Sequence, residues 1–332
     1  MAVGRSFMPM RVIIDTDPGI DDALALVLAL QSSELRVEAI TTVSGNVHVD
    51  LATRNALMVL DLFPPERRPL VARGADRPLT RPLYTAAHVH GEDGLGELWR
   101  YRTAGGKPCY EPAGDTPAAV DAVTCLLDLI RRFPGELTLI TLGPLTNVAH
   151  ALHRDAAVMR HLAGVIMMGG AVAVPGNVTP TAEFNIYVDP EAARRIFASG
   201  LPLSLIGLDV TERVRLTAEM IDQRVRPLGT RLSQFIVDCT AQAIQFSGRM
   251  ERAPGMAMHD PLVVGAAIEP SLVHTMPMPV QVETRGEWTA GMTVADRRPL
   301  PRDLRPAANV NVAVEVDAAR FLELFLTRLR TP

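Results

Sequence analysis

The stretch VIIDTDPGIDDALAL, residues 12–26, decides the fold expected for this chain of 332 residues. A short apolar run ends in Asp15, and a helical pattern begins at about Asp21. Pro18 and Gly19 lie between them and let the chain turn sharply. The stretch therefore predicts a buried β-strand, a tight turn and an α-helix, which together are the first half of a β-α-β unit.

Apolar runs of the same kind alternate with helical patterns along the chain. They are continuously apolar, which is typical of parallel strands covered by helices on both faces. The strand candidates are VEAITTV at 37–43, LTLITLG at 137–143, GVIMMGG at 164–170 and LSLIGLDV at 203–210; the helical candidates include 21–33, 116–133 and 189–200. The sequence therefore predicts an α/β fold with a mostly parallel central sheet flanked by helices.

The pattern changes after Thr211. Helices are predicted at about 217–250 and 260–268, followed by the strand-like segments VQVET and NVNVAVEV and a helix at AARFLELFLTRL. We expect this part to form a helical and antiparallel appendage on the same fold. No repeat or low-complexity linker divides the chain, so residues 1–332 are predicted to be a single domain. The segment 75–114 is rich in Gly, Pro and His and is predicted to be a long loop, which is functional or mobile.

Composition excludes several classes of function. A formal net charge of -4 without a long Lys/Arg cluster argues against nucleic acid as a partner. The three cysteines are widely spaced and offer neither a disulfide framework nor a CxxC metal site. Residues 1–10 lack an apolar run of signal-peptide length, and the apolar stretch 20–30 is interrupted by two Asp residues. We therefore expect a cytoplasmic protein without a membrane partner.

Four carboxylates, those of Asp15, Asp17, Asp21 and Asp22, lie within eight residues at the strand-to-helix turn. Ligands of open parallel sheets bind at the carboxyl ends of strands, which is where these residues fall. Their mutual repulsion must be offset by the helix amino terminus, by hydrogen bonds or by a bound cation. A cation bound here would be hard, calcium or magnesium rather than zinc, because the ligands are oxygens. The alternative is that Asp17 or Asp21 caps the helix and the other carboxylates are solvated.

The same stretch resembles the amino-terminal signature of the inosine-uridine-preferring nucleoside hydrolases, DxDxGxDDA, in the form DTDPGIDDA at 15–23. Further segments resemble the family in the same order. They are SGN at 44–46, HGEDGLG at 90–96, LGPLTNVA at 142–149, MGG at 168–170, GNVTPTAEFNIYVDPEAA at 176–193 and MHDP at 258–261. This resemblance implies the nucleoside hydrolase fold and hydrolysis of the N-glycosidic bond of ribonucleosides to free nucleobase and ribose.

The resemblance also implies a bound Ca²⁺, held by Asp17, Asp22, the main-chain carbonyl of Leu142 and Asp260. Leu142 stands where the family often has Thr, but a main-chain ligand needs only its carbonyl. Asp17 would accept a proton from the attacking water. The residues implied to hold the ribose hydroxyls are Asp21, Asn46, Asn177, Glu183 and Asn185.

The AEFN segment has two interpretations. Glu183 and Asn185 are two residues apart, which in an extended segment places both side chains on one face, suited to gripping a sugar. Both could instead be ordinary capping residues before a helix that begins at Asp189.

Two histidines are candidates for the nucleobase side of the site. His259 directly precedes Asp260, and we expect it to donate a proton or hydrogen bond to the departing base. His90 lies in a Gly-rich loop and is a candidate for substrate binding, with His88 as a possible substitute. The resemblance implies that the base contacts a helical region, here about 238–251, where the candidate residues are Gln242, Gln245, Phe246 and Arg249.

Two other functions fit part of the pattern. A phosphotransferase of the haloacid dehalogenase type also begins with DxD after a strand, but here Pro18 and Gly19 follow where that family has Gly and Thr. A nucleoside- or ribose-binding protein without turnover would have lost the base or the acid, and Asp17 and His259 are both present. We therefore expect a calcium-dependent ribonucleoside hydrolase that forms a homodimer or homotetramer, with its base preference left open.

Overall fold

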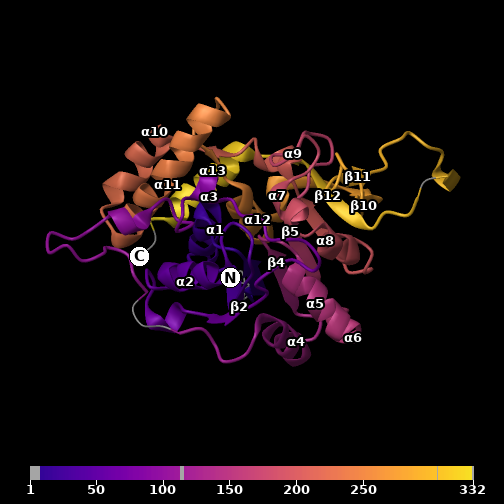
Figure 1. Ribbon diagram of the computed structural model, residues 1–332, viewed down its shortest axis with the longest axis horizontal. Coiled ribbons are helices and arrows are strands. Elements are labelled where there is room, and N and C mark those ends of the chain that lie inside the picture. Colours follow the sequence, from indigo (N-terminus) through magenta and orange to yellow (C-terminus); the bar gives the residue numbers. More distant parts are fainter. Residues whose placement is uncertain (1–7, 113–115, 305, 331–332) are drawn as a thin grey trace, which may run out of the picture.

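An eight-stranded sheet crosses the molecule in the order β3-β2-β1-β4-β5-β6-β12-β9 (Figure 1). The computed structural model describes residues 8–112, 116–304 and 306–330. Three predictions include positions outside these described residues. They concern the amino terminus, the loop at 75–114 and the single domain over 1–332. The strands are β3 (Leu70–Arg73), β2 (Leu35–Thr42), β1 (Met10–Thr16), β4 (Leu137–Thr141), β5 (Gly164–Met168), β6 (Leu203–Ile206), β12 (Val310–Val316) and β9 (Val273–Met278). Of these eight strands, only β9 runs antiparallel to its neighbour.

Side chains alternate between the two faces of the sheet, and helices cover both faces. In β1, Val12 and Ile14 join one buried cluster while Ile13 joins the other. The first cluster is covered by α1 (Ile20–Leu30), α2 (Val49–Leu60), α11 (Arg231–Met250), α12 (His259–Ile268) and α13 (Ala318–Arg328). The second is covered by α4 (Ala122–Arg132), α5 (Thr146–Arg154), α6 (Ala156–Met159) and α8 (Pro190–Phe197). Figure 1 shows α11 and α13 at the upper left and α4 to α6 at the lower right. The predicted α/β architecture is confirmed.

The strand order reverses beside β1. The chain runs from β1 to β2 and β3 on one side and then returns to β4 on the other side of β1. Leu142 N donates a hydrogen bond to Asp15 O at 2.7 Å, so the contact between β1 and β4 continues to the strand ends. Ligands of doubly wound sheets bind outside the carboxyl ends of strands at such a reversal. The topology therefore places the acidic turn and the segment after β4 at one site.

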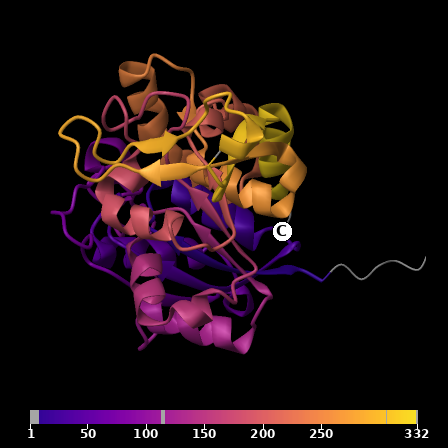
Figure 2. The ribbon, with the colours of Figure 1, turned by 90° about the vertical axis from the view of Figure 1, so that its right-hand side faces the viewer.

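The carboxyl-terminal part contains two antiparallel strand pairs, but one segment predicted to belong to the appendage lies in the main sheet. NVNVAVEV forms β12, which pairs in parallel with β6 and so belongs to the main sheet. Exposed and buried residues alternate along β12 because it lies one strand from the edge of the sheet. The same alternation is typical of a strand in a small antiparallel appendage. The antiparallel elements are β9 and a pair formed by β10 (Val280–Val282) and β11 (Thr293–Ala295), which packs against α8 and faces the viewer in Figure 2.

Two predicted helices differ in their limits. The helix predicted at 116–133 is α4 and begins at Ala122, because Asp121 caps it by accepting the Thr124 N–H at 2.9 Å. The helix predicted at 217–250 is interrupted where Pro227 precedes Gly229, whose φ of 62° is left-handed. Its pieces are α10 (Ala218–Met220), a π-helical turn η3 (Ile221–Val225), a 3-10 turn η4 (Arg226–Leu228) and α11.

The remaining elements are short. Strand β3 was not predicted, since LVAR is too brief to stand out in the sequence. The short helices are α3 (Ala87–His90), α7 (Phe184–Val188), α9 (Leu208–Thr211) and the 3-10 turns η1 (Pro65–Arg67), η2 (Leu98–Arg100), η5 (Pro270–Leu272) and η6 (Arg302–Leu304). A two-residue pairing joins β7 (Arg215–Leu216) to β8 (Met256–Ala257). Within the described ranges, no helix has both the length and the apolar character needed to cross a bilayer.

Candidate active site

Four buried carboxylates surround the turn between β1 and α1. Asp15 lies in β1, Asp17 follows it, and Asp21 and Asp22 lie in the first turn of α1. None of the four is more than 7% exposed. Burial disfavours the charged form of a carboxylate, so each needs hydrogen-bond donors or a counter-charge.

Asp15 has a structural role, because its hydrogen bonds join elements next to β1. Its Oδ1 accepts hydrogen bonds from Thr41 Oγ1 at 2.5 Å and from Asn147 Nδ2 at 2.7 Å. Burial raises the pKa of Asp15 to about 6 in spite of these two donors. Because Thr41 belongs to β2 and Asn147 to α5, Asp15 ties together the elements on both sides of β1.

Asp22 is held at the start of α1 by hydrogen bonds. Its Oδ1 accepts from Thr16 Oγ1 at 2.5 Å, and its Oδ2 accepts from Gly19 N at 2.9 Å. The same Oδ2 accepts from Asn46 Nδ2 at 2.9 Å, which brings the SGN segment after β2 onto the turn. The alternative, in which Asp17 or Asp21 caps the helix and the other carboxylates are solvated, was wrong: Asp22 accepts the Gly19 N–H of the turn, and all four carboxylates are buried.

Asp17 has one carboxylate oxygen without a partner. Its Oδ2 accepts the Asn46 backbone N–H at 2.6 Å. Its Oδ1 is buried and has no hydrogen-bond donor among the described residues. Glycines at 45 and 143 make room for this carboxylate, because a Cβ at either position would overlap its oxygen atoms. A buried unpaired carboxylate oxygen is costly unless a ligand satisfies it.

Asp260 joins the cluster from the first turn of α12. Asp21, Asp22 and Asp260 each offer a ligand oxygen, and these atoms lie within 4.8 Å of one another. Burial and then the charge of Asp21 raise the pKa of Asp260, and burial and then Asp22 raise the pKa of Asp17. A cation would relieve this repulsion, and all the donors are hard oxygens. The residues present therefore fit a divalent metal ion, with Asp21 beside the predicted ligands Asp22 and Asp260.

Leu142 brings the predicted main-chain ligand to the same place. The residue follows β4 directly, next to the end of β1. Its carbonyl accepts a hydrogen bond from Asn185 Nδ2 at 2.5 Å, and it lines a cavity together with Asp21 and Asp260.

This cavity has a volume of about 180 Å³. Its wall contains the two histidines singled out from the sequence, and all residues predicted to hold the substrate, which are Asp21, Asn46, His90, Asn177, Glu183 and Asn185. Asp17 and Asp22 lie outside the wall but contact it, because both accept hydrogen bonds from Asn46. The structure therefore gathers carboxylate, amide and imidazole side chains from well-separated chain segments around one cavity.

The AEFN segment is helical where an extended segment was predicted. Asn185 lies inside α7 and Glu183 is its N-cap, accepting the N–H groups of Asn185 at 2.9 Å and Ile186 at 3.2 Å. Glu183 also accepts the Gly170 N–H at 2.9 Å, which holds the MGG segment against α7. The argument from two-residue spacing was wrong, because a carboxylate with three backbone donors favours a helical turn. Both side chains still line the cavity. The helix predicted to begin at Asp189 is α8, which Asp189 caps.

His90 is positioned by the amino terminus of α1. Its Nδ1 accepts the Ile20 backbone N–H at 3.0 Å, so in the neutral ring the proton lies on Nε2. Burial lowers the pKa of His90 to about 4. At neutral pH His90 is therefore an uncharged hydrogen-bond donor. A Cβ at Gly19 would overlap the His90 ring, which explains the glycine in the turn.

His259 reaches the cavity from the start of α12. Its Nδ1 lies 2.7 Å from Thr211 Oγ1, at the end of α9, and this contact fixes the orientation of the ring. Burial lowers the pKa of His259, while the nearby carboxylate of Asp21 opposes the shift. The side chain therefore has a fixed orientation beside the carboxylate cluster.

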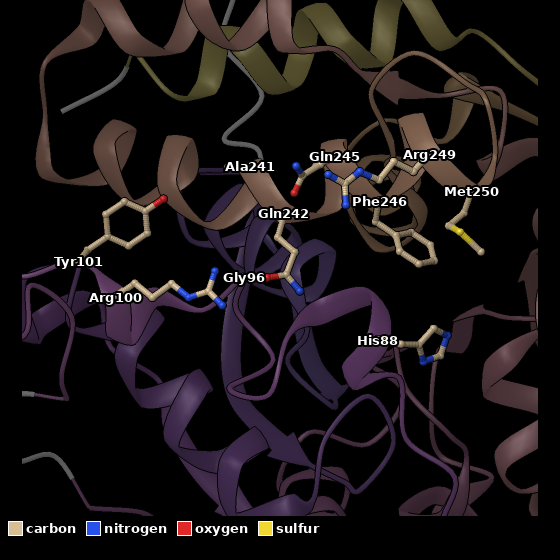
Figure 3. Close-up of a pocket in the computed structure, with 10 residues that line it drawn as sticks. All are labelled: His88, Gly96, Arg100, Tyr101, Ala241, Gln242, Gln245, Phe246, Arg249 and Met250. Atoms are coloured by element: carbon tan, nitrogen blue, oxygen red, sulfur yellow. The ribbon is translucent and has the colours of Figure 1, made fainter.

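Helix α11 forms the far wall of the cavity. Of the four residues expected to contact the base, Phe246 lines the cavity, whereas Gln242, Gln245 and Arg249 line a wider pocket beside it (Figure 3). The His88 and Phe246 rings separate the two spaces, with centroids 6.0 Å apart. The outer pocket has a volume of about 770 Å³.

A family comparison decides the class of the protein. Residues 12–323 match the model of a family described as inosine-uridine preferring nucleoside hydrolase. The chain belongs to this family. Family membership makes it an enzyme of the nucleoside hydrolase type, which acts on nucleosides with water.

Individual nucleoside hydrolases are similar over the whole chain. A pyrimidine-specific ribonucleoside hydrolase, RihA, of Salmonella gallinarum is 39% identical over 97% of this chain and 99% of its own length. The structure of a purine-preferring ribonucleoside hydrolase from Gardnerella vaginalis matches with a TM-score of 0.87 and 34% identity, over 96% of this chain and 98% of the other. A plant nucleoside hydrolase, PpNRh1, matches with a TM-score of 0.87 and 35% identity, over 98% of this chain and 100% of its own.

Sequence reasoning overlooked several residues of this nucleoside hydrolase site. Thr211 and Arg215 were missed because their contacts with the cavity wall are made across the fold. Ser247 and Glu251 lie within the predicted region 238–251, but only their helical spacing with Ala243 reveals that they share its cavity face. Gly45 was part of a quoted motif, yet its role depends on a contact with Asp17 that no pattern displays.

The close approach of Gly45 to Asp17 yields a test. Gly45→Ala should reduce kcat/KM on the preferred nucleoside by about 10²-fold or more, because displaced catalytic groups lose rate steeply. Gly105→Ala is the matched control, since a Cβ at Gly105 meets no atom closer than 3.9 Å. Steady-state kinetics and thermal unfolding of both variants provide the measurement. Full activity in Gly45→Ala would show that the Asp17 carboxylate can move freely.

Proposed function

We propose that this enzyme hydrolyses the N-glycosidic bond of ribonucleosides in a calcium-dependent reaction. The observation that carries the proposal is the cavity itself, in which a buried carboxylate cluster adjoins Asn46, Asn177, Glu183 and Asn185. These side chains supply donors and acceptors for the hydroxyl groups of a ribose. Family membership supplies the reaction class, and the oxygen-only donor set supports Ca²⁺. A binding protein without turnover is disfavoured by the presence of the acid-base groups.

Asp17, Asp22, the Leu142 carbonyl and Asp260 would hold the ion, with Asp21 next to them. When bound, Ca²⁺ supplies positive charge that orients vicinal hydroxyl groups and makes a neighbouring water more acidic. Asp17 suits the role of general base, since its Oδ1 has no hydrogen-bond partner among the described residues and burial raises its pKa. The nearby carboxylates stabilise positive charge that develops on the ribose when the glycosidic bond breaks.

The histidines would act on the leaving base. Nucleobases depart poorly as anions, so protonation or hydrogen bonding of the base lowers the barrier. His259, fixed by Thr211, would donate a proton or hydrogen bond to the base. His90 is a neutral donor through Nε2 and would bind substrate.

The cellular setting and the assembly are separate proposals. The three cysteines are free, which agrees with a reducing compartment such as the cytoplasm. Assembly into a homodimer or homotetramer stays a prediction that light scattering would test.

The reaction is tested by its products and its sugar selectivity. The purified protein with Ca²⁺ should release free ribose rather than ribose 1-phosphate, with phosphate present or absent. Uridine should exceed 2′-deoxyuridine in kcat/KM by about 10³-fold or more, because polar groups built for the 2′-hydroxyl are left unpaired by the deoxy sugar. Equal rates on the two sugars, or product seen only with phosphate, would refute the proposal.

The division of roles between Asp17 and His259 is tested with two leaving groups. A p-nitrophenyl riboside needs the same water and ribose contacts, but its leaving group departs without protonation. His259→Ala should lose about 10²-fold or more in kcat on a nucleoside and keep most of its rate on the p-nitrophenyl riboside, whereas Asp17→Asn should lose both. His150→Ala, on an exposed helix position, is the control. Equal losses by His259→Ala on both substrates would assign it to positioning instead.

A further inference from the structure

Glu251 lies in the wall of the nucleoside cavity, yet the mechanism above gives it no part. It caps the carboxyl end of α11, and Ala243, Ser247 and Glu251 follow one another at four-residue spacing along the face that lines the cavity. The carboxylate cluster and the sugar-binding side chains occupy the other walls. A nucleoside whose ribose contacts that cluster therefore directs its base toward this face of α11.

One oxygen of Glu251 is fully engaged by the protein. Arg215 Nη2 donates to Glu251 Oε2 at 2.5 Å, and Ser247 Oγ donates to the same atom at 2.6 Å. Arg215 also donates to Gly255 O at 2.9 Å and to Pro254 O at 3.2 Å, so its guanidinium is itself fixed by backbone. These contacts hold the carboxylate in one orientation against the β7–β8 pairing.

The other oxygen, Glu251 Oε1, has no hydrogen-bond partner within the part of the chain that the structure describes. The Glu251 side chain is 46% exposed, so this oxygen is open to the cavity and to solvent. Its partial burial disfavours ionisation, but the hydrogen bonds from Ser247 and Arg215 outweigh that effect and lower the pKa of Glu251. At neutral pH the side chain is a carboxylate, which only accepts hydrogen bonds.

The surroundings complete a binding site for a planar ring. Ala243, Phe246 and Met256 supply apolar walls beside the carboxylate. Gln245 and Arg249 line the separate outer pocket (Figure 3) and not the cavity, so neither is the polar group that lines the base end of the cavity.

We infer that Glu251 Oε1 accepts a hydrogen bond from an N–H group of the nucleobase and selects bases that present one toward α11. The inference rests on the proposed function and deepens it by naming the substrate class. Uracil and hypoxanthine offer a ring N–H, and cytosine offers an amino group. A base that presents only a carbonyl or ring nitrogen lone pair there meets a fixed anion and is rejected. The residue is thus a determinant of base specificity, and Arg215 is its positioning residue.

The test compares substrates that differ in a single N–H. Uridine and 3-methyluridine form one pair, and inosine and 1-methylinosine form another; the pair with the better substrate is used. The wild type should prefer the unmethylated nucleoside by about 10- to 100-fold in kcat/KM, the value of a hydrogen bond to a charged group. Glu251→Met keeps the length of the side chain and removes the acceptor. The ratio of the two kcat/KM values should therefore fall to within about 3-fold of unity, because kcat/KM on the unmethylated nucleoside decreases.

Two controls distinguish recognition of the base from a general loss of activity. Hydrolysis of the p-nitrophenyl riboside, which lacks an N–H, should change by less than about 3-fold in Glu251→Met. Glu212→Gln removes a carboxylate that also lies near Arg215 but outside the cavity wall, and it should keep the wild-type preference.

An unchanged preference in Glu251→Met would overturn the inference, as would an equal loss on the p-nitrophenyl riboside. If the wild type hydrolysed no nucleoside, the proposed function would fail on its own. The ratio of dissociation constants for the same two nucleosides, in wild type and Glu251→Met, would then still decide whether Glu251 accepts a hydrogen bond from the base.

Discussion

Electrostatic repulsion among buried carboxylates is the constraint on which the site depends. Asp17, Asp21, Asp22 and Asp260 are brought together without an opposing Lys or Arg lining the cavity that the described residues form. Hydrogen bonds satisfy Asp22, but Asp17 Oδ1 finds no partner in the part of the chain that the structure describes. A fold that depended only on stability would not keep such a cluster, because each buried anion costs free energy. The cluster is explained when it binds a cation and a sugar.

The sheet topology makes this concentration of charge possible. Strand order reverses between β1 and β4, so the loops that follow these strands meet over a gap that neither adjoining helix covers. The DTDPG turn and the LGPLT segment both lie there, and α12 adds Asp260 by packing on α1. Glycines at 45 and 143 allow the backbone to approach Asp17 closely. The strand order and the two glycines thus both determine how closely the backbone surrounds the Asp17 carboxylate.

The sequence predicted the sheet, its flanking helices and the segments around the cavity, because apolar periodicity and acidic motifs are local signals. It misplaced NVNVAVEV, since alternating burial describes an edge hairpin and a near-edge parallel strand equally well. It did not reveal the Thr211 contact of His259 or the Arg215 contact of Glu251, because both join residues more than 30 positions apart. Such contacts follow from tertiary packing, which a single sequence does not display.

Direct measurement of calcium binding tests the central claim, that one ion holds the carboxylate cluster together. Metal-stripped protein would be titrated with Ca²⁺ in a calorimeter, alongside Asp260→Asn and the exposed control Asp76→Asn. We predict one site per chain in the wild type and in Asp76→Asn, with affinity lost by at least about 10-fold in Asp260→Asn. Wild-type protein that binds no Ca²⁺, or Asp260→Asn that binds it unchanged, would contradict the account.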